Sequence, residues 1–295
     1  MSSIPKRVTE DMTITENPLV LCSGTLPRRT PFLERLQAAN AAGYSGVSLW
    51  GRDYNAAREE GYSDRDMTKM FADHGLFVAE LDPAWWWTPG AESFSIPAEL
   101  DELEVFRYRE QELFRIAAAL GARSLNAADV LGGDWTVVEA AASFGALCDR
   151  ASELGLMVHL EWLAWSKIPD LASASRVVEL ADRPNGGLNI DMWHCARTGV
   201  TADDLAALPG DRVIAVQLDD GPTTPEKNLI EATLHERLLP GTGAFDLVGY
   251  LQALDSIGCS APLGVEVFSD ELHALGPIEA ARLAAESTRR LLTLV

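Results

Sequence analysis

Short apolar runs alternate with longer amphipathic segments along the whole chain. The apolar runs predict eight buried strands, at residues 19–22, 46–51, 76–81, 124–128, 157–161, 187–191, 213–217 and 263–266. Between and after them, apolar residues recur at helical spacing. This pattern predicts helices at residues 31–42, 63–74, 97–120, 136–154, 169–181, 202–207, 245–254 and 277–292.

The regular alternation of strand and helix predicts an α/β fold built from parallel βα units, and eight such units close a barrel. We therefore expect a single (β/α)8 TIM barrel with a parallel eight-stranded core over residues 18–295, preceded by a polar N-terminal arm at residues 1–17. The alternative architecture is an open doubly wound sheet. No GxGxxG motif follows the first strand, which disfavours that alternative.

Four of the predicted strands run into a polar residue. These residues are Glu161, Asp191, Gln217 and Glu266. The carboxyl ends of successive barrel strands ring one face, so the four side chains are expected to converge there. For any one of them a strand-end polar group or a helix cap is the simpler interpretation, but four together indicate a shared partner. Three carboxylates and one amide oxygen are hard ligands, which predicts one divalent cation, with Mn²⁺ preferred and Mg²⁺ or Co²⁺ as alternatives.

Composition narrows the range of partners. The chain has 295 residues, 47% of them apolar, and a formal net charge of −20, which disfavours nucleic acids and anionic membranes as partners. No apolar run approaches the length of a membrane span, and the N-terminus has no apolar leader. The four cysteines form no CxxC pair, so we expect buried free thiols in a cytoplasmic protein.

The order of these residues resembles the xylose isomerase-like barrel superfamily, and the resemblance covers essentially the whole chain. The superfamily includes sugar epimerases and isomerases, inosose-converting enzymes, 3-dehydroshikimate dehydratases and endonuclease IV-type nucleases. The resemblance is carried by Glu161, the motif Asp191-x-x-His194, Gln217 and Glu266. The stretch from Arg237 to Asp246, RLLPGTGAFD, is also similar to the family's Arg…Pro-Gly-x-Gly-x-(apolar)-Asp element.

The resemblance implies roles for individual residues. Glu161, Asp191, Gln217 and Glu266 would hold one divalent metal. Glu161 and Glu266 would also be the catalytic pair, one on each face of the substrate. His194 and Arg237 match positions that usually contact substrate oxygens. Barrels of this kind often pair through their outer helices or loops, so a homo-oligomer is possible.

The departures from the family pattern also carry information. Many relatives have histidine where this chain has Gln217, and many have lysine where it has Asp219, whereas the aspartate at Asp220 is kept. Dehydratases of the group often have a histidine at the position of Leu163. The nucleases need several more histidines for a trinuclear cluster, and this chain has five in all.

The tryptophans all lie at or shortly after predicted strand ends. They are Trp50, Trp85, Trp86, Trp87, Trp135, Trp162, Trp165 and Trp193. A tryptophan ring offers a broad apolar face to a sugar ring, although loop packing explains any single one. We expect Trp50, Trp86, Trp162 and Trp193 to contact the substrate. A wall of such rings suits a neutral ring or glycoside better than a sugar phosphate.

These observations predict a metal-dependent isomerase or epimerase that acts through an enediolate on a non-phosphorylated ketose, cyclitol or keto-sugar. The alternative is a lyase or dehydratase that carries out β-elimination on a keto-sugar, a keto-glycoside or a dehydroshikimate-like ring, because both reactions can use the same site. A non-catalytic sugar-binding barrel is a third hypothesis. The intact metal quartet counts against it, because a binding protein need not keep two glutamates around a cation.

Overall fold

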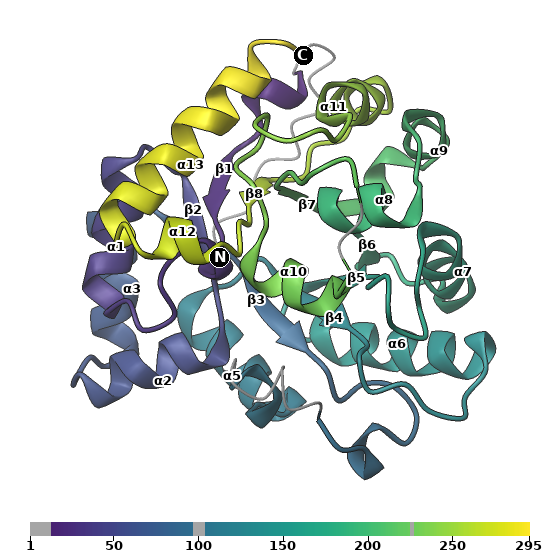
Figure 1. Ribbon diagram of the computed structural model, residues 1–295. Coiled ribbons are helices and arrows are strands. Elements are labelled where there is room, and N and C mark those ends of the chain that lie inside the picture. Colours follow the sequence, from purple (N-terminus) through teal and green to yellow (C-terminus); the bar gives the residue numbers. More distant parts are fainter. Residues whose placement is uncertain (1–12, 97–103, 225–226) are drawn as a thin grey trace.

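Eight parallel strands close a barrel in the computed structural model, which describes residues 13–96, 104–224 and 227–295 (Figure 1). The strands pair in chain order, and the last closes on the first through the pairs Leu19–Leu263 and Leu21–Val265. Their bounds are β1 Leu19–Leu21, β2 Gly46–Leu49, β3 Phe77–Ala84, β4 Ser124–Ala128, β5 Met157–Glu161, β6 Gly186–Asp191, β7 Val213–Leu218 and β8 Leu263–Val265. The predicted single (β/α)8 barrel is confirmed.

The strands are buried on both faces. Every residue of β2, β4, β6 and β7 is buried, because the barrel interior covers one face and the surrounding helices cover the other. This double burial explains why the sequence shows continuous apolar runs here rather than strict alternation.

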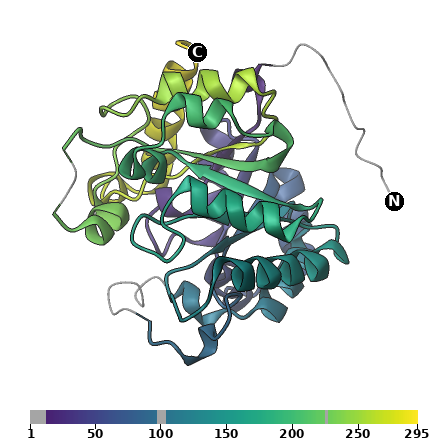
Figure 2. The ribbon, with the colours of Figure 1, turned by 90° about the vertical axis from the view of Figure 1, so that its right-hand side faces the viewer.

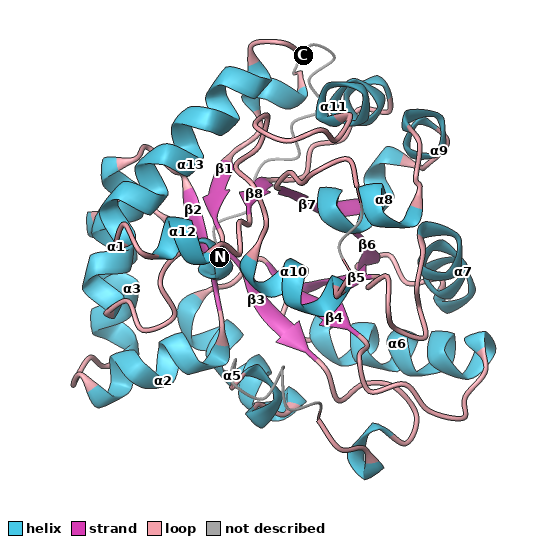
Figure 3. Ribbon diagram, in the orientation of Figure 1, coloured by secondary structure: helices cyan, strands magenta, loops and turns pink. Residues whose placement is uncertain are grey.

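A ring of helices surrounds the strands, as Figure 3 shows. Their bounds are α1 Phe32–Ala41, α2 Gly51–Glu59, α3 Asp64–Asp73, α5 Glu110–Leu120, α6 Val137–Ser152, α7 Leu171–Ala181, α8 Met192–Thr198, α9 Ala202–Ala206, α10 Leu229–His235, α11 Leu247–Ser256, α12 Asp270–His273 and α13 Pro277–Leu292. Capping boxes with a Ser or Thr begin α3, α6 and α9. Ser63 accepts from the N–H of Asp66 at α3, and Thr136 accepts from the N–H of Glu139 at α6.

The helix predicted at residues 97–120 is shorter than expected. Residues 97–103 lie outside the described part of the chain. Glu104 then adopts a φ of 60°, a short 3-10 turn spans Val105–Arg107, and α5 begins only at Glu110. Phe106 is buried and stacks on Trp85 with ring centroids 4.7 Å apart. Tertiary packing of this turn overrides the local helical spacing.

Within the described residues, four α-helices were not predicted, namely α2, α8, α10 and α12. Two of these, α10 and α12, lie inside the outer ring of helices and over the strands in Figure 1. The view in Figure 2 places the bright green α10 at one end of the barrel. This end, where the strands terminate, is therefore partly roofed by the connections after β7 and β8.

The long connection after β7 is closed by one buried carboxylate. Asp220 accepts hydrogen bonds from the backbone N–H groups of Gly221, Gly241, Gly243 and Phe245 at 2.8 to 3.0 Å. A Cβ atom at Gly243 would lie 2.3 Å from Asp220 Oδ1, so only glycine permits this close approach. The predicted Pro-Gly-x-Gly element thus folds around Asp220.

Part of the expected N-terminal arm packs under the barrel. Residues 1–12 lie outside the described part of the chain. Ile14 is buried and its N–H donates to Asp255 Oδ1 at 2.6 Å, while the Asn17 side chain donates to the carbonyls of Cys259 and Ala261. The four cysteines are buried free thiols, as expected. Within the described residues, no helix combines the length and the apolar character that crossing a membrane requires.

Candidate active site at the barrel mouth

The four expected metal ligands lie at the carboxyl ends of strands. Glu161 and Asp191 are the last residues of β5 and β6. Gln217 stands next to the end of β7, and Glu266 follows β8 directly. The strand register places Asp191 beside Gln217. All four are buried, so their polar groups share a space that is largely closed to water.

Glu161, Asp191 and His194 form a compact group, in which one possible ligand atom from each lies within 4.8 Å of the others. The Asp191 carboxylate also caps the N-terminus of α8, where it accepts hydrogen bonds from the N–H groups of Trp193 at 2.7 Å and His194 at 3.2 Å. Neither ring nitrogen of His194 has a hydrogen-bond partner among the described residues. Burial lowers the pKa of His194 to about 4, so the imidazole is neutral, which is its metal-binding form.

Arg237 lies among three of the carboxylates. Its Nη1 donates to Asp191 Oδ2 at 2.9 Å and to Asp219 Oδ2, and it lies 3.6 Å from Glu266 Oε2. Its Nε donates to the Thr233 carbonyl, which ties the guanidinium to α10. Burial alone would lower the pKa of Arg237, but the three carboxylates raise it above its ordinary value. This guanidinium is therefore a fixed positive charge.

The negative charge around Arg237 exceeds what one guanidinium can balance. Burial is the main reason why the pKa values of Glu161, Glu266 and Asp219 lie well above their usual range. Carboxyl groups this densely buried must hold either protons or a cation. Among the described residues, the buried carboxyl groups that pair with Arg237 or line the neighbouring cavity are Asp82, Glu161, Asp191, Asp219 and Glu266. A divalent cation fits this donor set of anionic oxygens and one neutral imidazole.

The side-chain amide of Gln217 is also available to a cation. Its Oε1 accepts from Asn189 Nδ2 at 2.7 Å, while Gln217 Nε2 and Asn189 Oδ1 lack partners among the described residues. If both amides rotate by 180°, Gln217 donates to Asn189 and the hydrogen bond between them is kept. The Gln217 oxygen is then free to act as a ligand.

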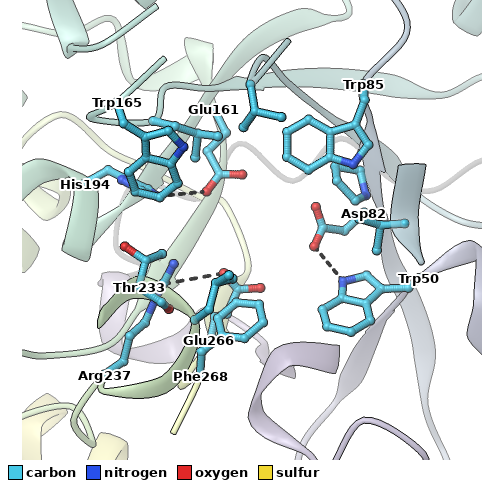
Figure 4. A pocket seen from close by; sticks show the side chains of 15 residues that line it. Trp50, Asp82, Trp85, Glu161, Trp165, His194, Thr233, Arg237, Glu266 and Phe268 are labelled. Atoms are coloured by element: carbon cyan, nitrogen blue, oxygen red, sulfur yellow. Dashed lines mark hydrogen bonds and ion pairs between the residues drawn. The ribbon is translucent and has the colours of Figure 1, made fainter. Parts of the chain in front are cut away.

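A cavity of about 70 Å³ opens beside these groups. Figure 4 shows Glu161 and Glu266 entering it from opposite sides. Asp82 also lines the cavity, where burial raises its pKa to about 7 with a further contribution from Glu80. The remaining wall is largely apolar and comes from Trp50, Pro83, Trp85, Val105, Val130, Leu163, Trp165, Leu234 and Phe268.

Three tryptophan rings face the cavity. Trp50 stacks on Phe268 with ring centroids 5.9 Å apart and donates from Nε1 to Asp82 at 3.0 Å. Trp165 meets His194 edge to face at 5.4 Å, and Trp85 closes the wall on the side of Asp82. Of the four tryptophans expected to contact substrate, Trp50 lines this space.

The other three expected tryptophans stand apart from the cavity. Trp162 is fully buried in the main hydrophobic core. Trp193 is fully buried against Phe245. Trp86 donates to the Phe106 carbonyl and lies under Arg109, whose Cζ is 3.6 Å from the ring centroid. Trp193 belongs to α8 and Trp86 to a turn, so their common place after a strand end does not give them a common orientation.

Sequence reasoning passed over several cavity residues. Asp82 obeys the same strand-end rule as the expected ligands, since it stands near the end of β3, and this signal could have identified it. Thr233 and Phe268 come from connections whose path the apolar pattern does not reveal. Asn126 lies within β4 and donates from Nδ2 to both Asp82 Oδ1 at 2.8 Å and Glu161 Oε2 at 2.6 Å.

Comparison with known proteins identifies the family of this barrel. A family model described as xylose isomerase-like TIM barrel matches residues 36–293. A 3-dehydroshikimate dehydratase from Pseudomonas aeruginosa is 31% identical over 261 residues, which cover 86% of this chain and 38% of that protein. An inosose isomerase from Bacillus subtilis is 30% identical over 144 residues, which cover 48% of this chain and 51% of that protein. The chain thus spans well under half the length of the dehydratase.

Solved structures share the fold over almost the whole chain. The IolI protein with a bound zinc atom has a TM-score of 0.78 at 20% identity and covers 94% of this chain and 98% of its own. At that identity the likeness speaks for the fold alone. A xylose isomerase domain protein from Alicyclobacillus acidocaldarius has a TM-score of 0.72 at 27% identity, with the same coverage of both chains.

Proposed function

We propose that this chain, which belongs to the xylose isomerase-like TIM-barrel family, is a divalent-metal-dependent isomerase or epimerase acting on an uncharged ketose, cyclitol or keto-sugar. The observation that carries the proposal is the pair Glu161 and Glu266. These two buried carboxyl groups come from β5 and β8 and face each other across one cavity. Two acid–base groups on opposite sides of a substrate are what epimerisation requires.

The cation would be held by Glu161, Asp191, Gln217 and Glu266, and His194 is within reach of the first two. When bound, a divalent ion polarises the substrate carbonyl and makes the proton on the neighbouring carbon more acidic. The three carboxylates of this set are buried near one another, and two of them, Asp191 and Glu266, lie beside Arg237; a cation would relieve their mutual repulsion. Mn²⁺ is the preferred ion, because the set is rich in oxygen.

The protein's own part is to move one proton. One glutamate, as carboxylate, removes the proton from the carbon beside the carbonyl, and the other, as carboxylic acid, returns a proton to the opposite face. Asn126 holds Glu161 in place through Oε2, whereas Glu266 Oε1 has no partner among the described residues and stays available. Burial holds the pKa values of both glutamates well above their usual range, which lets one of the pair carry a proton where a solvated glutamate would be ionised.

The cavity suits an uncharged substrate. Arg237 and His194 are the basic residues among the described ones that line it. Arg237 is already paired with buried carboxylates, and burial lowers the pKa of His194 to about 4, so it is neutral. A phosphate or carboxylate on the substrate would meet no protein counter-charge here. Four aromatic rings, those of Trp50, Trp85, Trp165 and Phe268, offer apolar faces to a sugar ring instead.

A lyase acting at the same site is the second candidate. The 31% identity to a 3-dehydroshikimate dehydratase over 86% of this chain supports it. Proton removal next to a carbonyl leads to β-elimination when a leaving group sits one carbon further on. The cavity offers an anionic group no basic side chain that is not already paired or neutral among its described lining, which favours the isomerase, because a dehydroshikimate carries a carboxylate.

The test is a substrate screen in D₂O with the Mn²⁺-loaded protein, using an inosose, a free ketohexose and 3-dehydroshikimate. We expect deuterium to enter a polyol substrate without loss of water. Elimination of water from 3-dehydroshikimate as the fastest reaction would replace the proposal by the lyase.

Two glutamine variants complete the design. Glu266→Gln should keep bound Mn²⁺ and lose most activity, because an amide can ligate but cannot act as a base. Glu271→Gln, at an exposed position in α12, is the matched control and should keep full activity. Near-normal turnover of Glu266→Gln with metal bound would limit Glu266 to a ligand.

A further inference from the structure

Asp82 is a buried carboxyl group that neither the metal set nor the proton transfer uses. It stands near the end of β3 and is 8% exposed, and it lines the cavity. Figure 4 shows it on the side of the cavity opposite His194 and Arg237, between Trp50 and Trp85. Asp82 is not part of the compact group formed by Glu161, Asp191 and His194.

The orientation of this carboxyl group is fixed by two donors. Trp50 Nε1 donates to Oδ2 at 3.0 Å, and Asn126 Nδ2 donates to Oδ1 at 2.8 Å. Each oxygen accepts one hydrogen bond from these donors, so each keeps a second lone pair. Trp50 is itself held between Phe268 and the guanidinium of Arg52, whose Cζ lies 4.3 Å from the ring centroid. The carboxyl group is thus presented to the cavity by a rigid support.

We propose, on the basis of the proposed function, that Asp82 is a substrate-contacting residue that hydrogen-bonds to a ring hydroxyl on the side away from the cation and so selects which carbon is placed between Glu161 and Glu266. A ring held by the cation at its carbonyl and by Asp82 at a distant hydroxyl cannot rotate in its own plane. The same pair of glutamates then acts on one carbon only.

A purely structural role accounts poorly for this residue. Burying a carboxyl group costs free energy unless hydrogen-bond partners offset that cost. The two donors to Asp82, Trp50 and Asn126, both belong to the wall and do not satisfy its side toward the cavity. An apolar side chain would complete the wall between Trp50 and Trp85 at lower cost. Burial raises the pKa of Asp82 to about 7, so the group can either donate or accept toward a hydroxyl near neutral pH. Both forms suit a hydroxyl of an uncharged polyol, and the ionised form repels an anionic group.

The experiment compares Asp82→Ala and Asp82→Asn with the wild type, all loaded with Mn²⁺, on the best substrate of the D₂O screen. The control is Asp129→Asn. Asp129 is also fully buried and follows β4, but it accepts from the backbone N–H groups of Leu131 and Gly132 and does not line the cavity. KM, kcat, metal content, thermal stability and the ring position of the deuterium are measured for each variant.

We expect Asp82→Ala to raise KM about tenfold or more, since it loses a hydrogen bond to a charged or acidic group. It should also spread deuterium over more than one carbon while metal content stays at the wild-type level. Asp129→Asn should keep the wild-type KM and labelling pattern. If Asp82→Ala does not fold, Asp82→Asn tests the proposal instead. Its amide keeps the size of the group but turns an N–H toward one of the two donors, so KM should again rise.

The outcomes separate this inference from the proposed function. A wild-type protein that turns over none of the screened substrates would overturn the proposed function and this inference with it. An active wild type, together with an Asp82→Ala variant whose KM and labelling pattern are unchanged at full metal content, would overturn the role of Asp82 alone.

Discussion

Metal binding at the barrel mouth is expected to release protons, and the number follows from the proposed ligands. Burial raises the pKa values of Glu161 and Glu266 well above 4.5, the ordinary value, so both hold protons in the metal-free protein at mildly acidic pH. Burial alone would also raise the pKa of Asp191, but Arg237 lowers it, so this group has no proton to release. Gln217 carries no titrating proton.

His194, which lies near the proposed metal ligands, does not change the number of protons released on metal binding. Burial lowers the pKa of His194 to about 4, so the ring is already neutral above that value. Between one and two protons should therefore leave when the cation binds. Each released proton raises the apparent association constant about tenfold per pH unit, or about 1.4 kcal/mol. The affinity for Mn²⁺ should therefore rise with pH above about pH 4.5, by up to about tenfold per unit for each proton released, until the glutamates are ionised in the metal-free protein.

The same groups give the metal-free protein an unusual pH dependence. The pKa values of Glu161 and Glu266 are higher in the folded than in the unfolded chain. Their contribution to stability is fully present below about pH 4.5 and is lost as the pH rises through their folded-state values. His194 acts in the opposite sense, because its pKa is lowered to about 4 and its contribution is lost as the pH falls below 6.5. Mn²⁺ should therefore stabilise the protein more strongly at higher pH.

Isothermal titration of the metal-free protein with Mn²⁺, in two buffers of different ionisation enthalpy, measures the released protons directly. Glu266→Gln is the internal check, since it removes one of the two titrating ligands and should release about one proton fewer. An affinity that is flat between about pH 5 and pH 7, with no proton release, would show that both glutamates are ionised before the metal arrives.

Five further variants test three separate parts of the structure. Arg237→Met should lower the free energy of unfolding of the metal-free protein by about 3–5 kcal/mol, because Asp191, Asp219 and Glu266 lose the guanidinium that pairs with them. The loss should be smaller once Mn²⁺ is added, and an equal loss with and without metal would contradict this reasoning. Trp162→Ala should cost about 3–5 kcal/mol in urea unfolding as a core residue, whereas Trp165→Ala, at the cavity, should raise KM with a smaller loss of stability. Gly243→Ala should lower the free energy of unfolding by about 1–3 kcal/mol, because the new Cβ would lie 2.3 Å from Asp220 Oδ1. Gly145→Ala in α6 is the control: its Cβ would come no closer than 3.6 Å to a neighbour, so it should leave stability unchanged or raise it slightly.

The barrel was predictable because its signal is local and repeated eight times. A strand of this barrel is buried on both faces, so it appears in the sequence as a continuous apolar run. Such a run can be recognised without knowledge of the rest of the fold. Helix ends were similarly clear where a capping box is written in the sequence, as at Ser63 and Thr136. The helix expected at residues 97–120 was confirmed from Glu110 to Leu120 but was wrong at residues 104–109, where the side chain of Phe106 packs on Trp85 and the chain is not yet α-helical.

The site was predictable to the extent that strand ends define it. Glu161, Asp191, Gln217 and Glu266 could be found because their strands could be found. The walls were harder, because the direction of a side chain in a loop depends on contacts that no periodicity records. Trp85 faces the cavity while Trp86, one residue later, lies under Arg109. Residues that enter from the connections, such as Thr233, depend on how those connections fold.

The clamp formed by Asp220 bears on how this barrel could diversify. Because its carboxylate joins the beginning and the end of the connection between β7 and α11, the points where that segment leaves and re-enters the barrel are fixed independently of what lies between them. For a segment pinned at both ends, doubling the length of the insert costs only about 0.6 kcal/mol. The insert carries Thr233 and Leu234, which roof the cavity. A different insert between the same two points would place different side chains over the cavity. The substrate preference could thus change while the eight strands stay as they are.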